Sequence, residues 1–206
     1  MRTRVKVCGL TNVEDAVSCA RFGVDAIGLN FYAKSPRYIS LETAMAIAVD
    51  TPPFVTLVAL FVNPQPHEVK RVIETVGVSL LQFHGDEPAG FCSQFGVPYI
   101  KACRMNAGVD LLESMQSYGA ASAWLADAYT EQYGGAGKQF DWTRLPTVCP
   151  RPLVLSGGLS PENAGEAVRR VRPWALDVCS GVESSKGVKD RLRVAAFITE
   201  VRNADE

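Results

Sequence analysis

The chain has 206 residues, of which 47% are hydrophobic, and its 21 Lys and Arg nearly balance its 22 Asp and Glu. This length fits one domain or two small ones, and the hydrophobic share is enough to bury a core, which excludes a disordered chain. The balanced charge argues against a nucleic-acid or membrane-surface protein, since such proteins usually carry a basic excess.

The first half of the chain alternates between short β-branched runs and helix-like segments. Strands are predicted at residues 5–8, 26–31, 54–62 and 79–85, and helices at 13–23, 41–49 and 66–77, with a short, weak helix at 87–96. The helix ends are indicated by Asn12 and Ser40 as N-caps, by Pro66 in a first turn, and by Gly23 and Gly77 as stops.

The second half repeats this pattern. Strands are predicted at 98–103, 122–128, 152–158 and 174–181, and helices at 109–119, 160–171 and 189–203, with a short helix at 140–145. Eight strands, each followed by a helix or the remnant of one, indicate parallel βαβ units closed into a single (β/α)₈ barrel domain over residues 1–206. The competing architecture is an open doubly wound sheet. A dinucleotide site is disfavoured, because no Gly-x-Gly-x-x-Gly follows the first strand.

The N-terminus and the cysteines bear on the compartment and on metals. The segment MRTRVKVCGLT lacks the apolar region of a signal peptide, and no apolar run approaches the roughly 20 residues that span a bilayer. We therefore expect a soluble, cytoplasmic protein. Six cysteines form no Cys-x-x-Cys pair and accompany only two histidines, so neither a disulfide framework nor structural zinc is expected. Most of these thiols are predicted to act as small core residues.

Polar residues collect on one face of the predicted strands, near their carboxyl ends. Strand side chains alternate between faces, and the active sites of barrel enzymes lie at the carboxyl ends. The alternation places the following residues inside the barrel: Cys8, Asn30, Gln82, His84, Lys101, Asp127 and Asp177. One interpretation is a self-satisfied polar plug, with Lys6 and Lys101 neutralising the acids. For the set as a whole, a functional site is the better interpretation.

Two late segments predict a phosphate site. LSGGLSPEN (155–163) and CSGVESSKG (179–187) each place Ser-Gly just after a strand. Backbone amides of glycine-rich loops bind phosphate, and barrels often use the loops after strands seven and eight for this purpose. The alternative is that these glycines only permit tight turns. A third glycine-rich loop, at 127–142, does not match the nucleotide P-loop pattern.

These segments together resemble one family, the phosphoribosylanthranilate isomerases of tryptophan biosynthesis. The matching pieces span nearly the whole chain in the family's order and are KVCGLT (6–11), GLNFYAKSPRYI (28–39), LLQFHGDE (80–87), the DAY…GGAGKQFDW loop (127–142), LSGGLSPENA (155–164) and LDVCSGVES (176–184). The resemblance implies a cofactor-free Amadori rearrangement of an aminoaldose phosphate to an aminoketose phosphate, with Cys8 as general base and Asp127 as general acid.

The implied roles carry physical requirements. Cys8 must be biased toward the thiolate, which Lys6 or amides after Gly9 would favour. Asp127 must hold a proton, which burial or a neighbouring carboxylate such as Asp177 would favour. Arg37 is implied to hold the anthranilate carboxylate, the alternative being a solvated loop arginine.

The remaining residues assigned to the substrate contact the sugar or its phosphate, or orient the catalytic pair: Gln82, His84, Asp177, Gly135, Gly137, Gly157, Gly158, Ser180 and Gly181. The chain departs from the family pattern at Ala136 and Cys179, where hydroxyl residues are usual, and we expect small effects there. No cofactor or metal is expected, and the partner is a phosphosugar substrate, bound by a monomer or homodimer.

Two other functions remain as alternatives. A histidine-pathway aminoaldose isomerase would call for an acidic residue at the position of Cys8 and a second phosphate site. A non-catalytic binder of sugar phosphates would keep the glycine loops but would not need Cys8 and Asp127 together.

Overall fold

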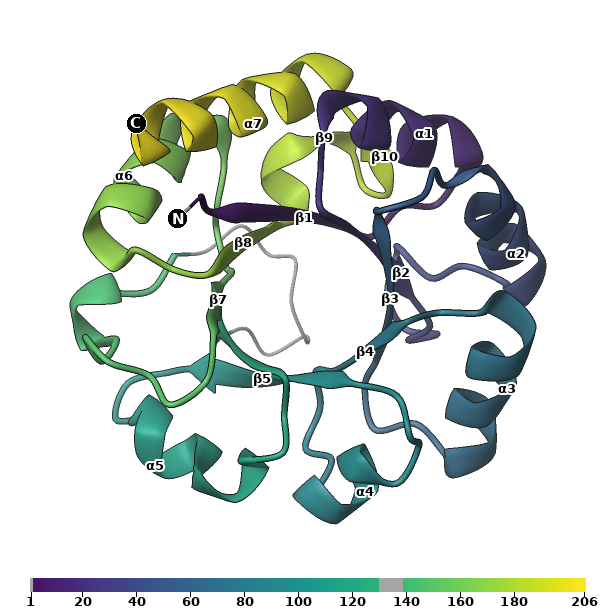
Figure 1. Ribbon diagram of the computed structural model, residues 1–206, viewed down its shortest axis with the longest axis horizontal. Coiled ribbons are helices and arrows are strands. Elements are labelled where there is room, and N and C mark those ends of the chain that lie inside the picture. The colour runs from purple at the N-terminus through teal and green to yellow at the C-terminus, as the bar shows by residue number, and fades with distance from the viewer. Residues whose placement is uncertain (1, 130–138) are drawn as a thin grey trace.

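The computed structural model describes residues 2–129 and 139–206 and shows a closed barrel of parallel strands inside a ring of helices (Figure 1). The strands are β1 (Arg4–Cys8), β2 (Ala26–Asn30), β3 (Thr56–Phe61), β4 (Leu80–Phe83), β5 (Tyr99–Met105), β6 (Ala123–Ala128), β7 (Leu153–Leu155) and β8 (Ala175–Val178). Each strand pairs with the next in the chain, and β8 pairs with β1. The predicted (β/α)₈ barrel is confirmed, and the open sheet is excluded.

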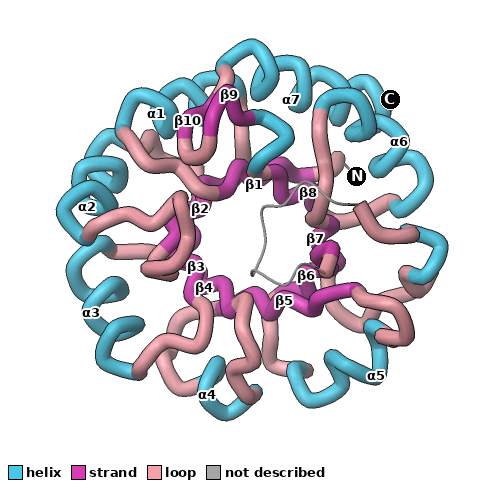
Figure 2. Tube along the Cα trace, turned by 180° about the vertical axis from the view of Figure 1, so that it is seen from behind, coloured by secondary structure: helices cyan, strands magenta, loops and turns pink. Residues whose placement is uncertain are grey.

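The helices lie outside the strands, as Figure 2 shows from the opposite side. They are α1 (Val13–Phe22), α2 (Leu41–Asp50), α3 (Pro66–Val76), α4 (Ala89–Ser93), α5 (Leu111–Met115), α6 (Pro161–Val171) and α7 (Arg191–Asp205). The predicted N-caps are confirmed, since the side chain of Asn12 accepts a hydrogen bond from Asp15 N and that of Ser40 from Thr43 N. No helix in the described ranges is long and apolar enough to cross a membrane.

Three short turns and one hairpin differ from the predicted elements. The helix predicted at 109–119 is α5 followed by a 3₁₀ turn, η1 (Gln116–Tyr118), and the one predicted at 140–145 is only a 3₁₀ turn, η2 (Trp142–Arg144). After β8 the chain forms η3 (Ser180–Val182) and then an antiparallel hairpin, β9 (Glu183–Ser185) and β10 (Val188–Lys189), which the sequence did not predict. The hairpin lies beside α1 (Figures 1 and 2).

The core has two layers because successive strand residues point to opposite sides. The larger cluster fills the space between strands and helices, and it contains Val5 and Val7 of β1. A smaller apolar cluster fills the barrel interior with Ile100, Ala102 and Leu125. This apolar cluster closes the barrel below the polar residues at the carboxyl ends of the strands.

Lys101 does not point into the barrel, as the alternation had predicted. Its neighbours Ile100 and Ala102 belong to the interior cluster, so Lys101 faces the helices. There its Nζ donates to the carbonyls of Phe83 and Gly85, at 3.3 and 2.6 Å. It also pairs with Glu87 at 3.2 Å. The prediction was wrong because β5 is apolar on both faces, which hides the phase of its alternation.

The two ends of the described chain meet at the amino-terminal end of β1. The backbone N–H of Thr3 donates to Asp205 Oδ2 at 2.7 Å, and its hydroxyl donates to Oδ1 at 2.8 Å. The last helix is thereby fixed to the first strand, on the face opposite the strands' carboxyl ends.

Candidate active site

Lys6 and Cys8 share the inner face of β1, as the alternation predicted. Parallel pairing sets Lys6 opposite Asp177 of β8, and Lys6 Nζ donates to Asp177 Oδ2 at 2.8 Å. Both side chains are at most 5% exposed. Gly28 of β2 faces the same space, where a Cβ atom would lie 2.7 Å from Cys8 Sγ. A side chain at position 28 would therefore displace the thiol.

The thiol of Cys8 is buried, and this burial raises its pKa above the ordinary value of 9.0. The adjacent ammonium of Lys6 lowers the pKa but does not outweigh the loss of solvation, and Asp177 raises it further. Lys6 therefore biases Cys8 toward the thiolate, as expected, but the net shift of the pKa is in the opposite direction. The reason is that the loss of solvation at the barrel mouth raises the pKa of Cys8 more than the charge of Lys6 lowers it.

A line of three side chains crosses the mouth from β4 to β6. Gln82 Nε2 lies 3.0 Å from His84 Nδ1, and His84 Nε2 lies 2.9 Å from Asp127 Oδ2. If the amide of Gln82 donates, His84 Nδ1 is the acceptor and its Nε2–H donates to Asp127. Asp127 therefore contacts His84, whereas Asp177, its expected acidic neighbour, pairs with Lys6.

Two buried oxygens near this line have no hydrogen-bond partner among the described residues. They are Gln82 Oε1 and Asp177 Oδ1. Buried acceptors are usually satisfied, so a pair of orphan oxygens at the carboxyl ends of β4 and β8 indicates a place for ligand hydroxyl groups. The positions of these residues were predictable from the alternation of the strands, but which of their atoms remain unpaired was not.

The loops after β7 and β8 lie against each other. Gly157 and Gly158 have φ of +86° and +65°, values that glycine adopts readily. A side chain at Gly181 would collide with the carbonyl of Leu159, so the two loops approach backbone to backbone. Ser180 opens the η3 turn at this junction. Four of the residues assigned to phosphate thus come together, while Gly135, Ala136 and Gly137 lie outside the described residues.

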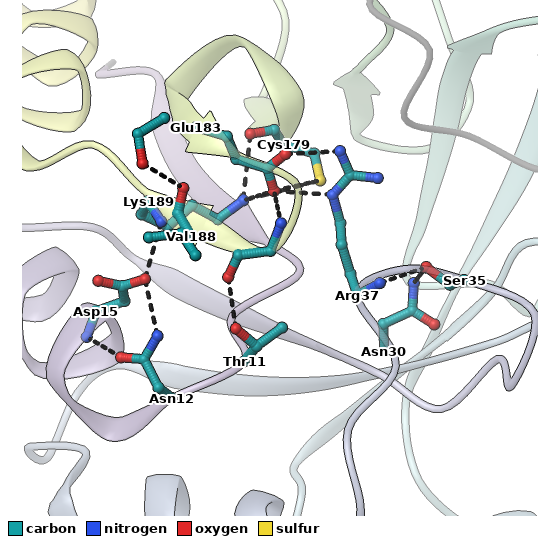
Figure 3. Close-up of polar contacts among 12 residues, drawn as sticks. Thr11, Asn12, Asp15, Asn30, Ser35, Arg37, Cys179, Glu183, Val188 and Lys189 are labelled. Atoms are coloured by element: carbon teal, nitrogen blue, oxygen red, sulfur yellow. Dashed lines mark hydrogen bonds and ion pairs between the residues drawn. The ribbon is translucent and has the colours of Figure 1, made fainter.

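Arg37 is buried rather than solvated, with 6% of its surface exposed. Its Nε and Nη2 donate to the two carboxylate oxygens of Glu183, at 2.8 and 2.6 Å. Lys189 donates to the same carboxylate at 2.8 Å, as Figure 3 shows. Sequence reasoning missed Glu183 and Lys189; the one available signal was that Glu183 follows the Ser-Gly pair in the quoted motif CSGVES.

The described residues contain no group of three or more His, Cys, Asp or Glu side chains placed to hold a metal ion. Lysine and arginine side chains instead pair with the carboxylates of Asp177, Glu87 and Glu183. The arrangement can hold an anion and exchange protons between a ligand and the groups at Cys8 and Asp127.

Comparisons with known proteins agree on one family. The family model described as N-(5′-phosphoribosyl)anthranilate isomerase matches residues 5–200. A relative of that name from Dechloromonas aromatica is 52% identical over 206 residues, covering 100% of this chain and 99% of the relative. The crystal structure of phosphoribosyl anthranilate isomerase from Thermotoga maritima is 41% identical, with a TM-score of 0.88 over 98% of this chain and 99% of that one.

Two further structures bear on ligand and assembly. One, 38% identical with a TM-score of 0.84, is a phosphoribosyl anthranilate isomerase in complex with reduced 1-(o-carboxyphenylamino)-1-deoxyribulose 5-phosphate. The other, 37% identical with a TM-score of 0.84, shows monomers generated from the dimeric Thermotoga maritima enzyme. Each aligns over 98% of this chain and 99% of its own.

Proposed function

The chain belongs to the N-(5′-phosphoribosyl)anthranilate isomerase family, and on that premise we propose that it performs the Amadori rearrangement with Cys8 as general base and Asp127 as general acid. The substrate is N-(5′-phosphoribosyl)anthranilate, and the product is 1-(2-carboxyphenylamino)-1-deoxyribulose 5-phosphate, a step of tryptophan biosynthesis. The observation that carries the proposal is that both side chains lie buried on the inner face of the barrel, Cys8 at the last residue of β1 and Asp127 near the end of β6.

The acid step opens the sugar ring. A proton moves from Asp127 to the ring oxygen, the C1′–O bond breaks, and the anthranilate nitrogen lone pair forms a Schiff base with C1′. The hydrogen bond from His84 occupies Oδ2 of Asp127 and leaves Oδ1 to carry the proton. Gln82 supports this arrangement, because its N–H fixes the tautomer of His84 that donates from Nε2.

The base step moves the double bond. Cys8 removes the proton from C2′, and the electrons flow toward the Schiff-base nitrogen to give an enolamine, which tautomerises to the ketone. C2′ is oxidised and C1′ is reduced, so the redox change balances within the substrate and needs no cofactor. The ammonium of Lys6 lowers the pKa of Cys8 against the effect of burial and favours the thiolate while the proton is transferred.

The remaining contacts follow the polar groups of the substrate. The orphan oxygens of Gln82 and Asp177 accept hydrogen bonds from the ribose hydroxyls. The phosphate binds at the junction of Gly157–Gly158 with Ser180–Gly181, with Gly135 and Gly137 remaining predicted contributors. Arg37 holds the aryl carboxylate through Nη1, the nitrogen not engaged by Glu183.

Loss of the fluorescence of freshly made phosphoribosylanthranilate tests the proposal. The wild type should turn over, and Cys8→Ser and Asp127→Asn should each lower kcat by ~10² or more, as loss of an acid or base does. Cys149→Ser is the matched control, because Cys149 is half-buried and packs against the outer core rather than the barrel mouth. Near-normal kcat in either site variant would contradict the role of that residue.

The same assay separates the alternatives. A sugar-phosphate binder would retain the ligand without consuming it, and a histidine-pathway isomerase would leave the anthranilate substrate unchanged while acting on its own aminoaldose.

We also propose that the protein is cytoplasmic and that it forms a homodimer. The relative described as dimeric supports the homodimer. Light scattering should then give twice the chain mass of 22.3 kDa.

A further inference from the structure

Two contacts that do not involve the guanidinium hold Arg37 in place: a hydrogen bond from its backbone N–H and the packing of its side-chain stem. Its backbone N–H donates to Ser35 Oγ at 3.1 Å, and Asn30 Nδ2 donates to the same hydroxyl at 3.1 Å. The stem runs over Gly9, the residue after Cys8, where a Cβ atom would lie 2.6 Å from Arg37 Cδ. The guanidinium therefore belongs to the wall of the site beside the proposed base.

Glu183 fixes the remaining freedom of that guanidinium. The two parallel hydrogen bonds to Nε and Nη2 hold the fork in one plane and one rotation. Both side chains are at most 7% exposed, so solvent does not compete for these contacts. The same geometry leaves Nη1 outside the pair, where it can donate to a ligand.

Glu183 is itself braced from the hairpin. Lys189 Nζ donates to Glu183 Oε1 at 2.8 Å and to the carbonyl of Cys179 at 3.2 Å, and the Gly187 N–H donates to the same Oε1 at 3.3 Å (Figure 3). Asp15, the other acid at this junction, accepts from the backbone N–H of Lys189 rather than from its ammonium. One carboxylate thus serves two buried cations.

We propose that Glu183, braced by Lys189, is a positioning residue that presents Nη1 of Arg37 to the substrate carboxylate and so sets the preference for a carboxylated aryl amine. The inference rests on the proposed function. A single shared carboxylate leaves the Arg37 end of this cluster rich in positive charge, and an aryl carboxylate would complete it. Without Glu183, the guanidinium would sample several rotations and lose the geometry of a preformed clamp.

The test compares two stable inhibitors, reduced 1-(o-carboxyphenylamino)-1-deoxyribulose 5-phosphate and the same compound without its carboxyl group. Glu183→Gln keeps the shape of the side chain and removes its charge. It should raise the Ki of the carboxylated inhibitor, and the substrate KM, by ~10-fold while kcat changes by less than ~2-fold, as expected for lost uniform binding. The Ki of the decarboxylated inhibitor should stay within ~2-fold, which a merely structural role would not predict.

A double-mutant cycle identifies the route of the effect. If Glu183 acts through Arg37, Glu183→Gln should add less than ~2-fold to the KM of Arg37→Ala. Glu166→Gln is the control for losing a carboxylate from an ion pair, because Glu166 meets Arg170 on the exposed face of α6. Its KM and both Ki values should equal those of the wild type.

Three results would overturn the inference: equal changes in both Ki values, additive effects with Arg37→Ala, or an unchanged KM in a folded Glu183→Gln protein. If that variant does not fold, Lys189→Met takes its place, and it should weaken the carboxylated inhibitor by ~3-fold or more while sparing the other. Equal changes in both Ki values in Lys189→Met, or no change in either, would contradict the bracing role. If the wild type is active and the variants behave like it, only the inference is refuted. If the wild type has no isomerase activity, the proposed function is refuted.

Discussion

Two buried lysine–carboxylate pairs, Lys6–Asp177 and Lys101–Glu87, lie on opposite faces of the same barrel. Each has a cysteine nearby: Cys8 beside the first pair and Cys92 beside the second. In the outer pair every oxygen of the carboxylate is used, since Glu87 Oε1 also accepts from the amides of Asn63 and Gly85. In the inner pair, Asp177 Oδ1 has no partner among the described residues.

The two pairs are alike in burial and charge, so the number of unpaired carboxylate oxygens is the property that distinguishes a structural pair from a functional one. A pair whose carboxylate oxygens all have partners stabilises the segments around it, here the loop that follows β4. A pair with an orphan atom keeps hydrogen-bonding capacity for a ligand at the cost of some stability. The comparison predicts that changes to the outer pair alter stability and changes to the inner pair alter activity.

The largest expected effect comes from Lys101→Met. It leaves Glu87 charged and buried and also removes the contacts to backbone carbonyls, so the free energy of unfolding should fall by about 3–5 kcal/mol. Urea denaturation measures this loss. The folded fraction should retain a kcat within about 2-fold of wild type at low temperature. A stable but inactive variant would contradict the structural role of the pair.

Lys6→Met should differ from Lys101→Met in losing activity in the folded protein, although it too leaves a buried carboxylate unpaired. Removing the ammonium withdraws the charge that lowers the Cys8 pKa, so kcat/KM at pH 7 should drop by about 10²-fold. Because kcat/KM reports ionisation in the free enzyme, its rising limb should also move to higher pH. A pH–rate profile from pH 6 to about 10 measures both effects, and an unmoved limb would show that Lys6 does not act on the thiol.

Gly28→Ala probes the space around the inner pair. The added methyl would lie 2.7 Å from Cys8 Sγ and 3.0 Å from Lys6 Nζ. We expect kcat to fall by about 10-fold through displacement of the thiol. Gly90→Ala in α4 is the matched control, because its methyl meets nothing within 4 Å. It should leave kcat unchanged and stabilise the fold by about 0.5–1 kcal/mol.

The smallest effect concerns the outer thiol at alkaline pH. Burial raises the pKa of Cys92 to about 12, so above pH 9 the folded chain keeps a proton that the unfolded chain releases. The free energy of unfolding should therefore fall as pH rises from 9 toward 12, by at most about 1.4 kcal/mol per pH unit for this group. Urea denaturation at pH 9 and 10 should give a shallower pH slope for Cys92→Ala. Equal slopes would exclude Cys92 as a contributor.

Much of the fold was predictable because its signals are local. β-branched runs, Asn12 and Ser40 as caps, and the Ser160-Pro161 start of α6 each act within a few residues. The inward faces of β1, β4, β6 and β8 were also correct, because a polar residue among apolar ones marks the phase of the alternation. At Lys101 the same reasoning failed, since an outward charge in a buried strand looks identical to an inward one.

The parts of the site that could not be predicted depend on distant partners. The bond between Arg37 and Glu183 joins residues 146 positions apart, through a hairpin without a clear sequence signal. The raised pKa of Cys8 depends on how completely the barrel mouth excludes water, which no short motif encodes. The orphan oxygens depend on which partners are missing, and only coordinates show that.

The bond between Thr3 and Asp205 has a consequence for chain connectivity. It places both ends of the described chain on the barrel face opposite Cys8 and Asp127. A short linker could therefore join them, and new termini could be opened in an exposed loop on that same face, such as the one before β3. Such a circular permutant would preserve every strand neighbour and every residue of the mouth, although it would change the order in which the strands are synthesised.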